Sequence, residues 1–179
     1  MTRRFKIPLL FGLFLLITSL TIVSQTDPAK ASRMKMQGMY LYQFAKNVYW
    51  PSEYNTGDFL IGIYGSKDLF NVLNNTFKDK VTGSQKIVFD FYESTSEIAD
   101  CHLLFVSKEE TSVITKVKKV LDQKTLLVTE LTDISNSTSS MINLLYVNSR
   151  LKYQLNKSEA EKNNFKIGQT LTKLAYSTI

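Results

Sequence analysis

Short apolar runs recur through the middle of the chain and suggest buried strands. Three of them, at 59–64, 103–106 and 126–128, are nearly continuous rather than alternating, which is typical of strands covered on both faces. Between the runs, apolar residues recur at helical spacing in 67–77 and 108–121. This alternation predicts a mainly parallel sheet with right-handed crossovers. The expected strands in this region are 59–64, 87–91, 103–106 and 126–128.

Both expected helices begin with a capping signal. Ser66 precedes the first helix, and Ser107 with Glu110 has the spacing of a capping box at the start of the second. Each helix also has one apolar side that should face the sheet. The residues expected on these sides are Leu69, Phe70, Leu73 and Phe77 in the first helix and Val113, Val117, Val120 and Leu121 in the second.

The pattern changes beyond residue 136, where two apolar segments flank a turn. Residues 141–147 and 151–155 lie on either side of Asn148-Ser149, an arrangement that predicts a β-hairpin. We therefore expect an α/β fold, a three-layer Rossmann-like sandwich whose mainly parallel sheet ends in a C-terminal antiparallel hairpin. A last helix is expected from the spacing of Ile167, Leu171, Leu174 and Ala175.

The first 31 residues have the pattern of an export signal. Three basic residues within the first six positions precede an uncharged apolar run at 7–23. The alternative is a retained membrane anchor, but a proline, a glycine and several hydroxyl residues dilute the hydrophobicity of the run. Small residues that suit cleavage occur between 24 and 31. We expect 1–31 to be a signal peptide, and 32–179 to be a single domain that resides in the periplasm without stable membrane insertion.

The charge of the chain argues against nucleic acid as a partner. Three of the 22 Lys and Arg residues lie before Ser24, so against 16 Asp and Glu the rest of the chain carries only about +3. The one basic cluster, at 116–119, lies on an expected helix and has no interleaved aromatic residues. A solvated helix face accounts for it.

A helix expected at 34–50 carries more apolar residues than one buried side requires. Met36, Met39 and Tyr40 fall toward its polar side. A helix that is apolar on more than one side is buried on both or touches a partner, so we expect these three residues to form an exposed patch for a partner or for a second copy of the chain. The alternative is that 32–40 are a frayed terminus. The stripe expected to cover the sheet is Met34, Gly38, Leu41, Phe44, Ala45 and Val48.

Cys101 and His102 are the only cysteine and the only histidine, and neither suggests catalysis. A single cysteine excludes an internal disulfide, and its place before an apolar run predicts a buried, inert thiol rather than a reactive one. Neighbours on a strand point to opposite faces, which suits neither a nucleophile–base pair nor a chelate. A zinc site would need carboxylates at a spacing that is absent. We expect no metal and no cofactor.

Ser66 and Ser107 each follow an expected strand, where ligands of open α/β sheets bind. Neither has the flanking glycines of a nucleophile elbow, and the chain has no GxGxxG or Walker sequence. Glu130 and Asp133 follow the 126–128 run as a possible carboxylate pair, although a polar loop also explains them. The sequence therefore supports no enzyme assignment, and contact of Ser66, Ser107 and Glu130 with a ligand or partner is a hypothesis.

Several segments resemble, in order and spacing, the YfiR-like family of bacterial periplasmic proteins. The resemblance runs from about residue 36 to 175, and its most specific block is Met141-Ile142-Asn143 followed by Arg150, Tyr153 and Asn156. Phe44, Trp50, Pro51 and Cys101 also match the family pattern. The segments are YLYQFAKNVYWP (40–51), FLIGIYGSKDLFNVL (59–73), CHLLFVS (101–107), TLLVTE (125–130), MINLLYVNSRLKYQLN (141–156) and IGQTLTKLA (167–175).

The resemblance implies a regulator that is not an enzyme. The best-known member of the family resides in the periplasm and represses an inner-membrane diguanylate cyclase, so that its release raises cyclic di-GMP and favours biofilm. The domain also occurs fused to sensor kinases, so the implied partner is an inner-membrane cyclase or kinase. Cys101 matches the family's Cys-His strand but has no second cysteine to pair with, which excludes the internal redox control that is possible in relatives.

Asn143 and Arg150 extend the ligand or partner hypothesis to the hairpin. Arg150 shares the polar side of its strand with Lys152 and Gln154, either as a solvated cation or as a bidentate clamp on a carboxylate or phosphate. The preferred interpretation of the chain is a periplasmic regulator that acts by protein–protein contact. A small-ligand sensor that feeds a kinase or transporter, and an unrecognised hydrolase, are the alternatives.

Overall fold

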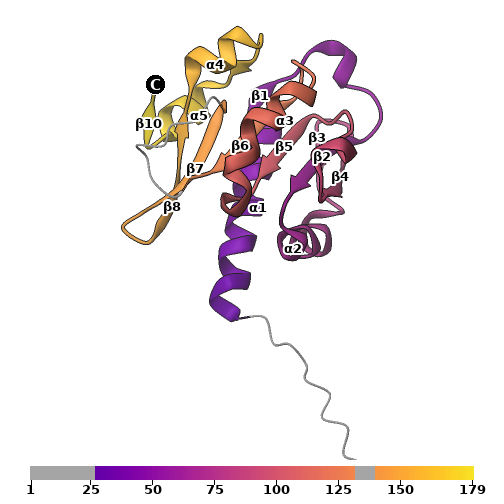
Figure 1. Cartoon of the computed structure of the whole chain (residues 1–179). Coiled ribbons are helices and arrows are strands. Elements are labelled where there is room, and N and C mark those ends of the chain that lie inside the picture. The colour runs from indigo at the N-terminus through magenta and orange to yellow at the C-terminus, as the bar shows by residue number, and fades with distance from the viewer. Residues whose placement is uncertain (1–26, 132–139) are drawn as a thin grey trace, which may run out of the picture.

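The computed structural model describes residues 27–131 and 140–179 (Figure 1). Most of the expected leader, and Asp133 of the possible carboxylate pair, lie outside these ranges. The elements are α1 (Pro28–Asn47), β1 (Val48–Tyr49), the 3-10 helix η1 (Ser52–Tyr54), β2 (Phe59–Tyr64), α2 (Lys67–Phe77), β3 (Val81–Thr82), β4 (Gln85–Tyr92), η2 (Thr95–Glu97), β5 (Leu103–Val106), η3 (Lys108–Val113), α3 (Ile114–Val120), β6 (Leu126–Glu130), β7 (Ile142–Val147), β8 (Arg150–Leu155), α4 (Lys157–Lys162), β9 (Lys166–Ile167), α5 (Gln169–Leu174) and β10 (Ser177–Thr178).

Eight of the described strands form one sheet in the order β10-β8-β7-β6-β5-β2-β4-β3. β2 pairs in parallel with β4 and β5, and the parallel pairing continues through β6 to β7. β7 and β8 form an antiparallel hairpin that pairs Ile142 with Leu155 and Val147 with Arg150. The expected α/β class, with its mainly parallel sheet, is confirmed, and the hairpin lies where the sequence predicts it.

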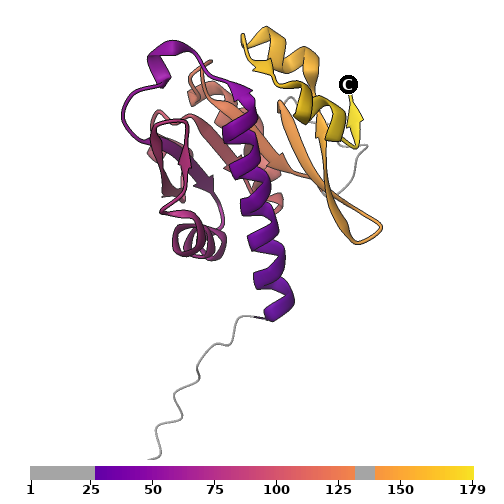
Figure 2. The same ribbon diagram turned by 180° about the vertical axis from the view of Figure 1, so that it is seen from behind.

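Apolar residues cover both faces of the middle of the sheet. Leu103 and Phe105 of β5 belong to the large cluster that α1 and α2 share, whereas Leu104 and Val106 belong to a second cluster with Val117 of α3. Alternate residues of one strand therefore face different helices, as the period of a strand requires. Figure 1 shows α3 in front of the sheet, and Figure 2, seen from behind, shows α1 in front of it.

Helix α1 differs from the expected helix at both ends. It begins at Pro28, because Asp27 caps it by accepting a hydrogen bond from the Ala29 backbone N at 2.9 Å, and proline fits the first helical position. It ends at Asn47, and Val48 and Tyr49 form β1, which pairs antiparallel with β9. Residues 32–40 are regular helix, and the whole expected stripe is buried.

Two expected inward residues are exposed because their helices are shorter and differently phased than the sequence suggests. The 108–121 segment opens with the 3-10 helix η3, whose three-residue period shifts the register of α3. Ile114 therefore becomes buried while Val120, at the last position of α3, is 50% exposed. In α5, Leu171 is buried, but Leu174 ends the helix and is 68% exposed.

Trp50 closes the end of α1 over an aromatic cluster. Its indole Nε1 donates a hydrogen bond to the Ala45 carbonyl at 3.0 Å, and its ring meets those of Phe59 and Phe165 edge-on at 5.0 and 5.5 Å. His102 stacks on Phe59 at 4.3 Å in the same cluster. The half-buried Pro51 follows Trp50 and leads into η1. This part of the family motif is therefore structural.

The Cys101 and His102 side chains are also structural. Cys101 is buried, and burial raises the pKa of its thiol to about 12. His102 Nδ1 accepts a hydrogen bond from the Leu60 backbone N at 3.1 Å, so the ring proton lies on Nε2 and is donated to the Tyr54 carbonyl at 2.9 Å. Both ring nitrogens are thus engaged by backbone. In the described ranges no helix is both long and apolar enough to cross a bilayer.

Candidate functional site

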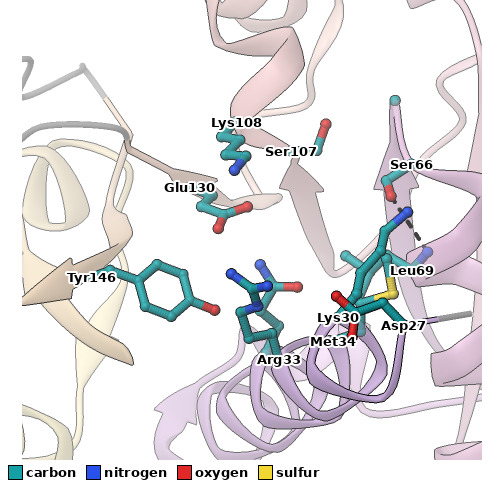
Figure 3. Close-up of a pocket in the computed structure, with 12 residues that line it drawn as sticks. Asp27, Lys30, Arg33, Met34, Ser66, Leu69, Ser107, Lys108, Glu130 and Tyr146 are labelled. Carbon is teal, nitrogen blue, oxygen red and sulfur yellow. Dashed lines mark hydrogen bonds between the residues drawn. The ribbon is translucent and has the colours of Figure 1, made fainter. Parts of the chain in front are cut away.

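The chain reverses its direction of winding at β2, which lies between β4 and β5 in the sheet. The connection after β2 enters α2 on one face, and the connection after β5 enters η3 and α3 on the other. In open parallel sheets, connections that part in this way leave a crevice beyond the carboxyl ends of the two strands, where ligands bind. A pocket of about 550 Å³ lies at this point (Figure 3). Its lining includes Arg33, Ser66, Ser107, Lys108, Glu130 and Tyr146.

The two strand ends that form the pocket lie close to each other at Gly65. This residue has a φ of +81°, and a β-carbon built on it would lie 3.1 Å from Ser107 Oγ and would collide with Glu110 Cγ. Only glycine therefore fits both the backbone conformation and the space. The next residue, Ser66, caps α2 by accepting a hydrogen bond from the Leu69 backbone N at 3.3 Å. The expected capping role of Ser66 is confirmed.

Ser107 does not cap a helix, contrary to the expected capping box. Its side chain is buried, with 3% of the residue exposed, and its hydroxyl has no hydrogen-bond partner among the described residues. The segment that follows is the 3-10 helix η3 rather than the α-helix that the sequence predicts. An unpaired buried hydroxyl costs about 1–3 kcal/mol, and the Tyr92 hydroxyl, outside the pocket, is buried without a partner in the same way.

Charged side chains from three elements converge in the pocket. Arg33 comes from α1, Lys108 from η3, and the buried Glu130 from the end of β6. Figure 3 shows Arg33 and Lys108 extending toward Glu130 from opposite sides, with the Tyr146 hydroxyl pointing toward Arg33. Burial raises the pKa of Tyr146, the Glu130 charge raises it further, and the Arg33 charge opposes the shift.

One residue that lines the pocket, Lys30, forms an ion pair with a residue outside the lining. Lys30 of α1 pairs with Asp68 in the first turn of α2 at 2.6 Å. Both side chains are more than half exposed, so the pair contributes little to stability. Lys30 is thus paired within the protein, and the two other cations that line the pocket, Arg33 and Lys108, are exposed residues.

Three of the five expected ligand or partner residues meet at this pocket, and two do not. Ser66, Ser107 and Glu130 line it together. Arg150 is exposed at the start of β8, does not line the pocket, and makes no hydrogen bond or ion pair within the described part of the chain. The clamp interpretation of Arg150 stays a prediction.

Asn143 is fully buried within a polar network between strands. Its side-chain carbonyl accepts hydrogen bonds from the hydroxyls of Thr129, at 2.7 Å, and Ser140. Its amide donates to Gln154 Oε1 at 3.2 Å, and Gln154 Nε2 donates to the Ser177 hydroxyl of β10 at 3.3 Å. This geometry ties β6, β7, β8 and β10 together, so Asn143 is positioned to hold the sheet rather than to face the pocket.

The expected exposed patch on α1 contains two of its three residues. Met36 and Met39 are 44% and 59% exposed. Tyr40 is not part of it, because its hydroxyl donates to the Leu151 carbonyl at 3.0 Å and its ring packs edge-on against Tyr153 at 5.6 Å. One helical position therefore separates a surface methionine from a tyrosine that joins α1 to β8.

Arg33, Lys108 and Tyr146 are among the pocket residues that the sequence analysis missed. Arg33 lies just past the expected leader, Lys108 directly follows Ser107, and Tyr146 lies in the hairpin. The position of Lys108 could have been predicted, because it directly follows Ser107 at the end of the same strand. The positions of Arg33 and Tyr146 could not have been predicted from local sequence. They line the pocket only because of how α1 and the hairpin are arranged in space.

The serine hydroxyls of the pocket differ in their hydrogen bonds. Ser66 Oγ is engaged as a helix cap, and the Ser107 hydroxyl has no hydrogen-bond partner among the described residues. Within 27–131 and 140–179 no three His, Cys, Asp or Glu side chains are grouped as metal ligands.

Asn156, the last residue of the motif, caps α4: its side-chain carbonyl accepts a hydrogen bond from the Glu159 backbone N at 3.0 Å.

The fold and pocket define a small α/β domain with a charged crevice at its topological switch point. Residues 34–176 match the family model described as YfiR/HmsC-like, and the chain therefore belongs to the YfiR/HmsC-like family. The expected resemblance is confirmed over nearly the same span. Membership suggests a periplasmic regulator of a diguanylate cyclase, since the family is regulatory rather than catalytic. No protein of known, curated function matches the chain.

Proposed function

We propose that this protein is exported to the periplasm and represses an inner-membrane diguanylate cyclase by binding the periplasmic region of that enzyme, without catalysing a reaction. The observation that carries the proposal is the family match over residues 34–176. An exported body with a signal peptide at 1–31 fits the same role. Repression of the cyclase would lower cyclic di-GMP and thereby limit attachment and biofilm.

The exposed face of α1 is the contact surface we propose for the partner. Met36 and Met39 lie three positions apart on a helix, which places them side by side on its surface. Methionine is flexible and polarizable, and it adapts to partner surfaces. The opposite side of α1 is held by the buried stripe, so the methionine face is presented on a fixed scaffold. A second copy of this chain is the other candidate for the same surface.

The proposal is tested with the double variant Met36→Glu/Met39→Glu. The matched control is Val120→Glu/Leu174→Glu, which places the same charges on two exposed apolar residues elsewhere. Both proteins should keep the wild-type melting temperature, because surface changes away from special features move stability by less than about 0.5 kcal/mol. Capture of the periplasmic region of a membrane diguanylate cyclase from the same organism should fail for the methionine variant alone, and cellular cyclic di-GMP should rise.

Sedimentation of the same proteins separates the two candidates for the surface. Loss of self-association with intact cyclase capture assigns the methionine face to a homodimer and moves the cyclase contact elsewhere. Wild-type behaviour in capture, sedimentation and cyclic di-GMP level would refute a role for the methionine face. If wild-type protein itself captures a sensor kinase instead of a cyclase, the partner class proposed here is wrong.

A further inference from the structure

We propose that the methionine face of α1 binds an acidic amphipathic helix of the partner, with apolar side chains over Met36 and Met39 and carboxylates against Lys35 and Lys46. The choice of partner rests on the function proposed above. The chemistry of the surface does not, because it follows from α1 and its neighbours, so the two can be tested separately.

Lys35 and Lys46 lie on the outer side of α1 together with the two methionines. Lys35 is four positions before Met39 and Lys46 is seven positions after it, so the three side chains follow one another along the helix surface. Both lysines are exposed. Figure 2 shows α1 in front of the sheet, with no other described element over its outer side. A partner can therefore contact the lysines and the methionines at the same time.

The positive charge of this side is not neutralised within α1. The helix contains no Asp or Glu anywhere in 28–47. Neither lysine forms an ion pair with a residue in the described ranges. The Lys46 ammonium lies 5.3 Å from the centre of the Tyr42 ring, and this contact leaves its charge in place.

The elements that pack against α1 do not neutralise the charge either. α1 contacts α2 and α5, and two of its tyrosine hydroxyls donate to backbone carbonyls of β8 and β3. These four elements contain one carboxylate, Asp68, which is paired with Lys30 at 2.6 Å. Asp79, in the turn after α2, forms no ion pair with a described residue. The outer side of α1 is therefore a basic surface with an apolar centre, which is complementary to an acidic segment with an apolar side.

The spacing of the lysines suits a helix as the partner segment. Lys35 and Lys46 are eleven positions apart, which at the rise of an α-helix separates them by about 16 Å along the axis. A second helix that packs along this ridge meets both lysines with carboxylates that are also about eleven positions apart, because three helical turns return a side chain to nearly the same side. Apolar residues between the two carboxylates then lie over Met36 and Met39.

A second copy of the chain and a membrane surface fit this face less well. In a two-fold symmetric contact the same patch meets itself, so the lysines of the two copies would repel one another. A helix that lies on a membrane surface buries large residues such as Trp, Phe and Leu. Within 28–47, however, the exposed large apolar residues are Met36 and Met39. An acidic protein segment is therefore the preferred occupant.

Three synthetic helical peptides test the surface without the cyclase. The acidic probe carries three leucines on one side, with a glutamate at each end of that side, eleven positions apart. The basic probe has lysines in place of the glutamates, and the polar probe has serines in place of the leucines. Calorimetric titration of the full mature protein should show saturable binding of the acidic probe and at least about tenfold weaker binding of the other two. Binding of the acidic probe that is no tighter than that of either control peptide, or that does not saturate with a Kd below about 1 mM, would overturn the inference.

Charge reversal locates the binding on α1. Lys35→Glu/Lys46→Glu should bind the basic probe more tightly than the acidic one, which inverts the preference of wild type. Lys35→Gln/Lys46→Gln should bind the two charged probes about equally, and it serves in place of the reversed variant if circular dichroism shows that the latter is not folded. An unchanged preference for the acidic probe in the folded variants would place the binding elsewhere and overturn the inference.

The matched control is Lys116→Glu/Lys119→Glu. It makes the same change of net charge at two exposed lysines of α3, and Lys119, like Lys46, lies in the last turn of its helix. This control should keep the wild-type preference for the acidic probe. If it also inverts the preference, net charge rather than the face of α1 selects the probe, and the inference is wrong.

Vesicles of phosphatidylglycerol and phosphatidylcholine in equal amounts test the membrane as the occupant. Wild type should not sediment with them at the protein concentrations that bind the acidic probe. Sedimentation with the vesicles that is lost in Lys35→Glu/Lys46→Glu, together with no binding of the acidic probe, would assign the face to anionic lipid and overturn the inference.

Cyclase capture then tests whether the partner uses this chemistry. Capture by wild type should weaken as the salt concentration rises from about 50 to about 500 mM, because salt screens exposed charges. It should fail for Lys35→Glu/Lys46→Glu and persist for Lys116→Glu/Lys119→Glu. Capture by Lys35→Glu/Lys46→Glu that equals that of wild type would overturn the inference while the proposed function stands. If wild type captures no cyclase, the proposed function is wrong, and the peptide titrations still decide the chemistry of the surface.

Discussion

Gly38 of α1 lies directly against Leu73 of α2. A β-carbon on Gly38 would collide with Leu73 Cδ2 and would lie 2.6 Å from Phe77 Cε2. Both of these side chains are buried in the core that the two helices share. Gly38 is therefore present for the close approach of two helices rather than for backbone freedom, and this approach sets how α1 crosses the sheet toward the pocket.

Gly38→Ala should destabilise the protein although alanine is the better helix former. Helix propensity favours the change by about 1 kcal/mol, but overpacking of a well-packed core costs roughly 1–3 kcal/mol. Leu73 has no exposed surface, and Phe77 lies in the same core. Urea unfolding followed by circular dichroism should show the loss, while the exposed Ser32→Ala on the same helix should be neutral or slightly stabilising. A gain in stability for Gly38→Ala would mean that the two helices are not in contact at this point.

Trp50→Ala should cost about 3–5 kcal/mol, because it empties the centre of the aromatic cluster. Trp50→Phe should cost about 1–2 kcal/mol, since it keeps a ring but loses the hydrogen bond to the Ala45 carbonyl. The neighbouring Tyr49→Ala is the matched control, because Tyr49 is 68% exposed and its loss should be nearly neutral. Denaturant midpoints of the three variants order these effects. Similar midpoints for Trp50→Ala and Tyr49→Ala would show that Trp50 is not part of the core.

Protonation of His102 should destabilise the folded state in mildly acidic solution. Burial lowers the pKa of its imidazole below the usual 6.5, and Nδ1 already accepts the Leu60 N–H. The unfolded chain therefore binds the proton more readily, so stability is unaffected by this group above about pH 6.5 and falls as the pH drops from 6.5 toward the folded pKa. Below the folded pKa the loss stops growing.

His102→Gln separates this effect from other titrations, because His102 is the only histidine in the chain. The variant will be less stable at pH 7.5, but its stability should vary less than that of wild type between pH 5 and 7. The measurement is the free energy of unfolding at a series of pH values. Parallel profiles for the two proteins across that interval would show that the imidazole has the same pKa folded and unfolded.

Export should remove a leader that ends between residues 24 and 31. Intact-mass measurement of protein recovered from the periplasm should therefore give an N-terminus between Gln25 and Ser32. The site matters for the pocket, because cleavage after Ala31 would remove Asp27 and Lys30 from α1 while Arg33 stays. Recovery of the full-length chain in the membrane fraction would identify the leader as an anchor instead.

Much of the fold could be predicted because the apolar runs of its strands are short and sharply bounded. The bounds of β2, β5 and α2 agree with the sequence analysis, since strong periodicity and the Ser66 cap leave few alternatives. The end of α1 could not be predicted in the same way. Val48 continues the helical stripe, and only its pairing with Ile167, far along the chain, makes it a strand residue.

Part of the candidate site could be predicted from the sequence. The rule that ligands bind at the carboxyl ends of parallel strands selects Ser66, Ser107 and Glu130, and the three meet as that rule requires. Tyr40 was misplaced because its two possible environments differ by a small rotation of the helix, and contact with Tyr153 decides between them. Arg33 depends on the length of α1 beyond the sheet, which no local pattern encodes.

Because Cys101 is buried, the protein can be labelled at an introduced cysteine without first replacing the native one. Burial raises the thiol pKa to about 12, so the reactive thiolate is scarce at pH 8, and the sulfur is covered. Maleimides and spin labels should therefore not react with the native cysteine, and should modify a new cysteine placed at Met36 or Met39. Distances and cross-links from the methionine face could then be collected on a protein whose own sulfhydryl needs no replacement.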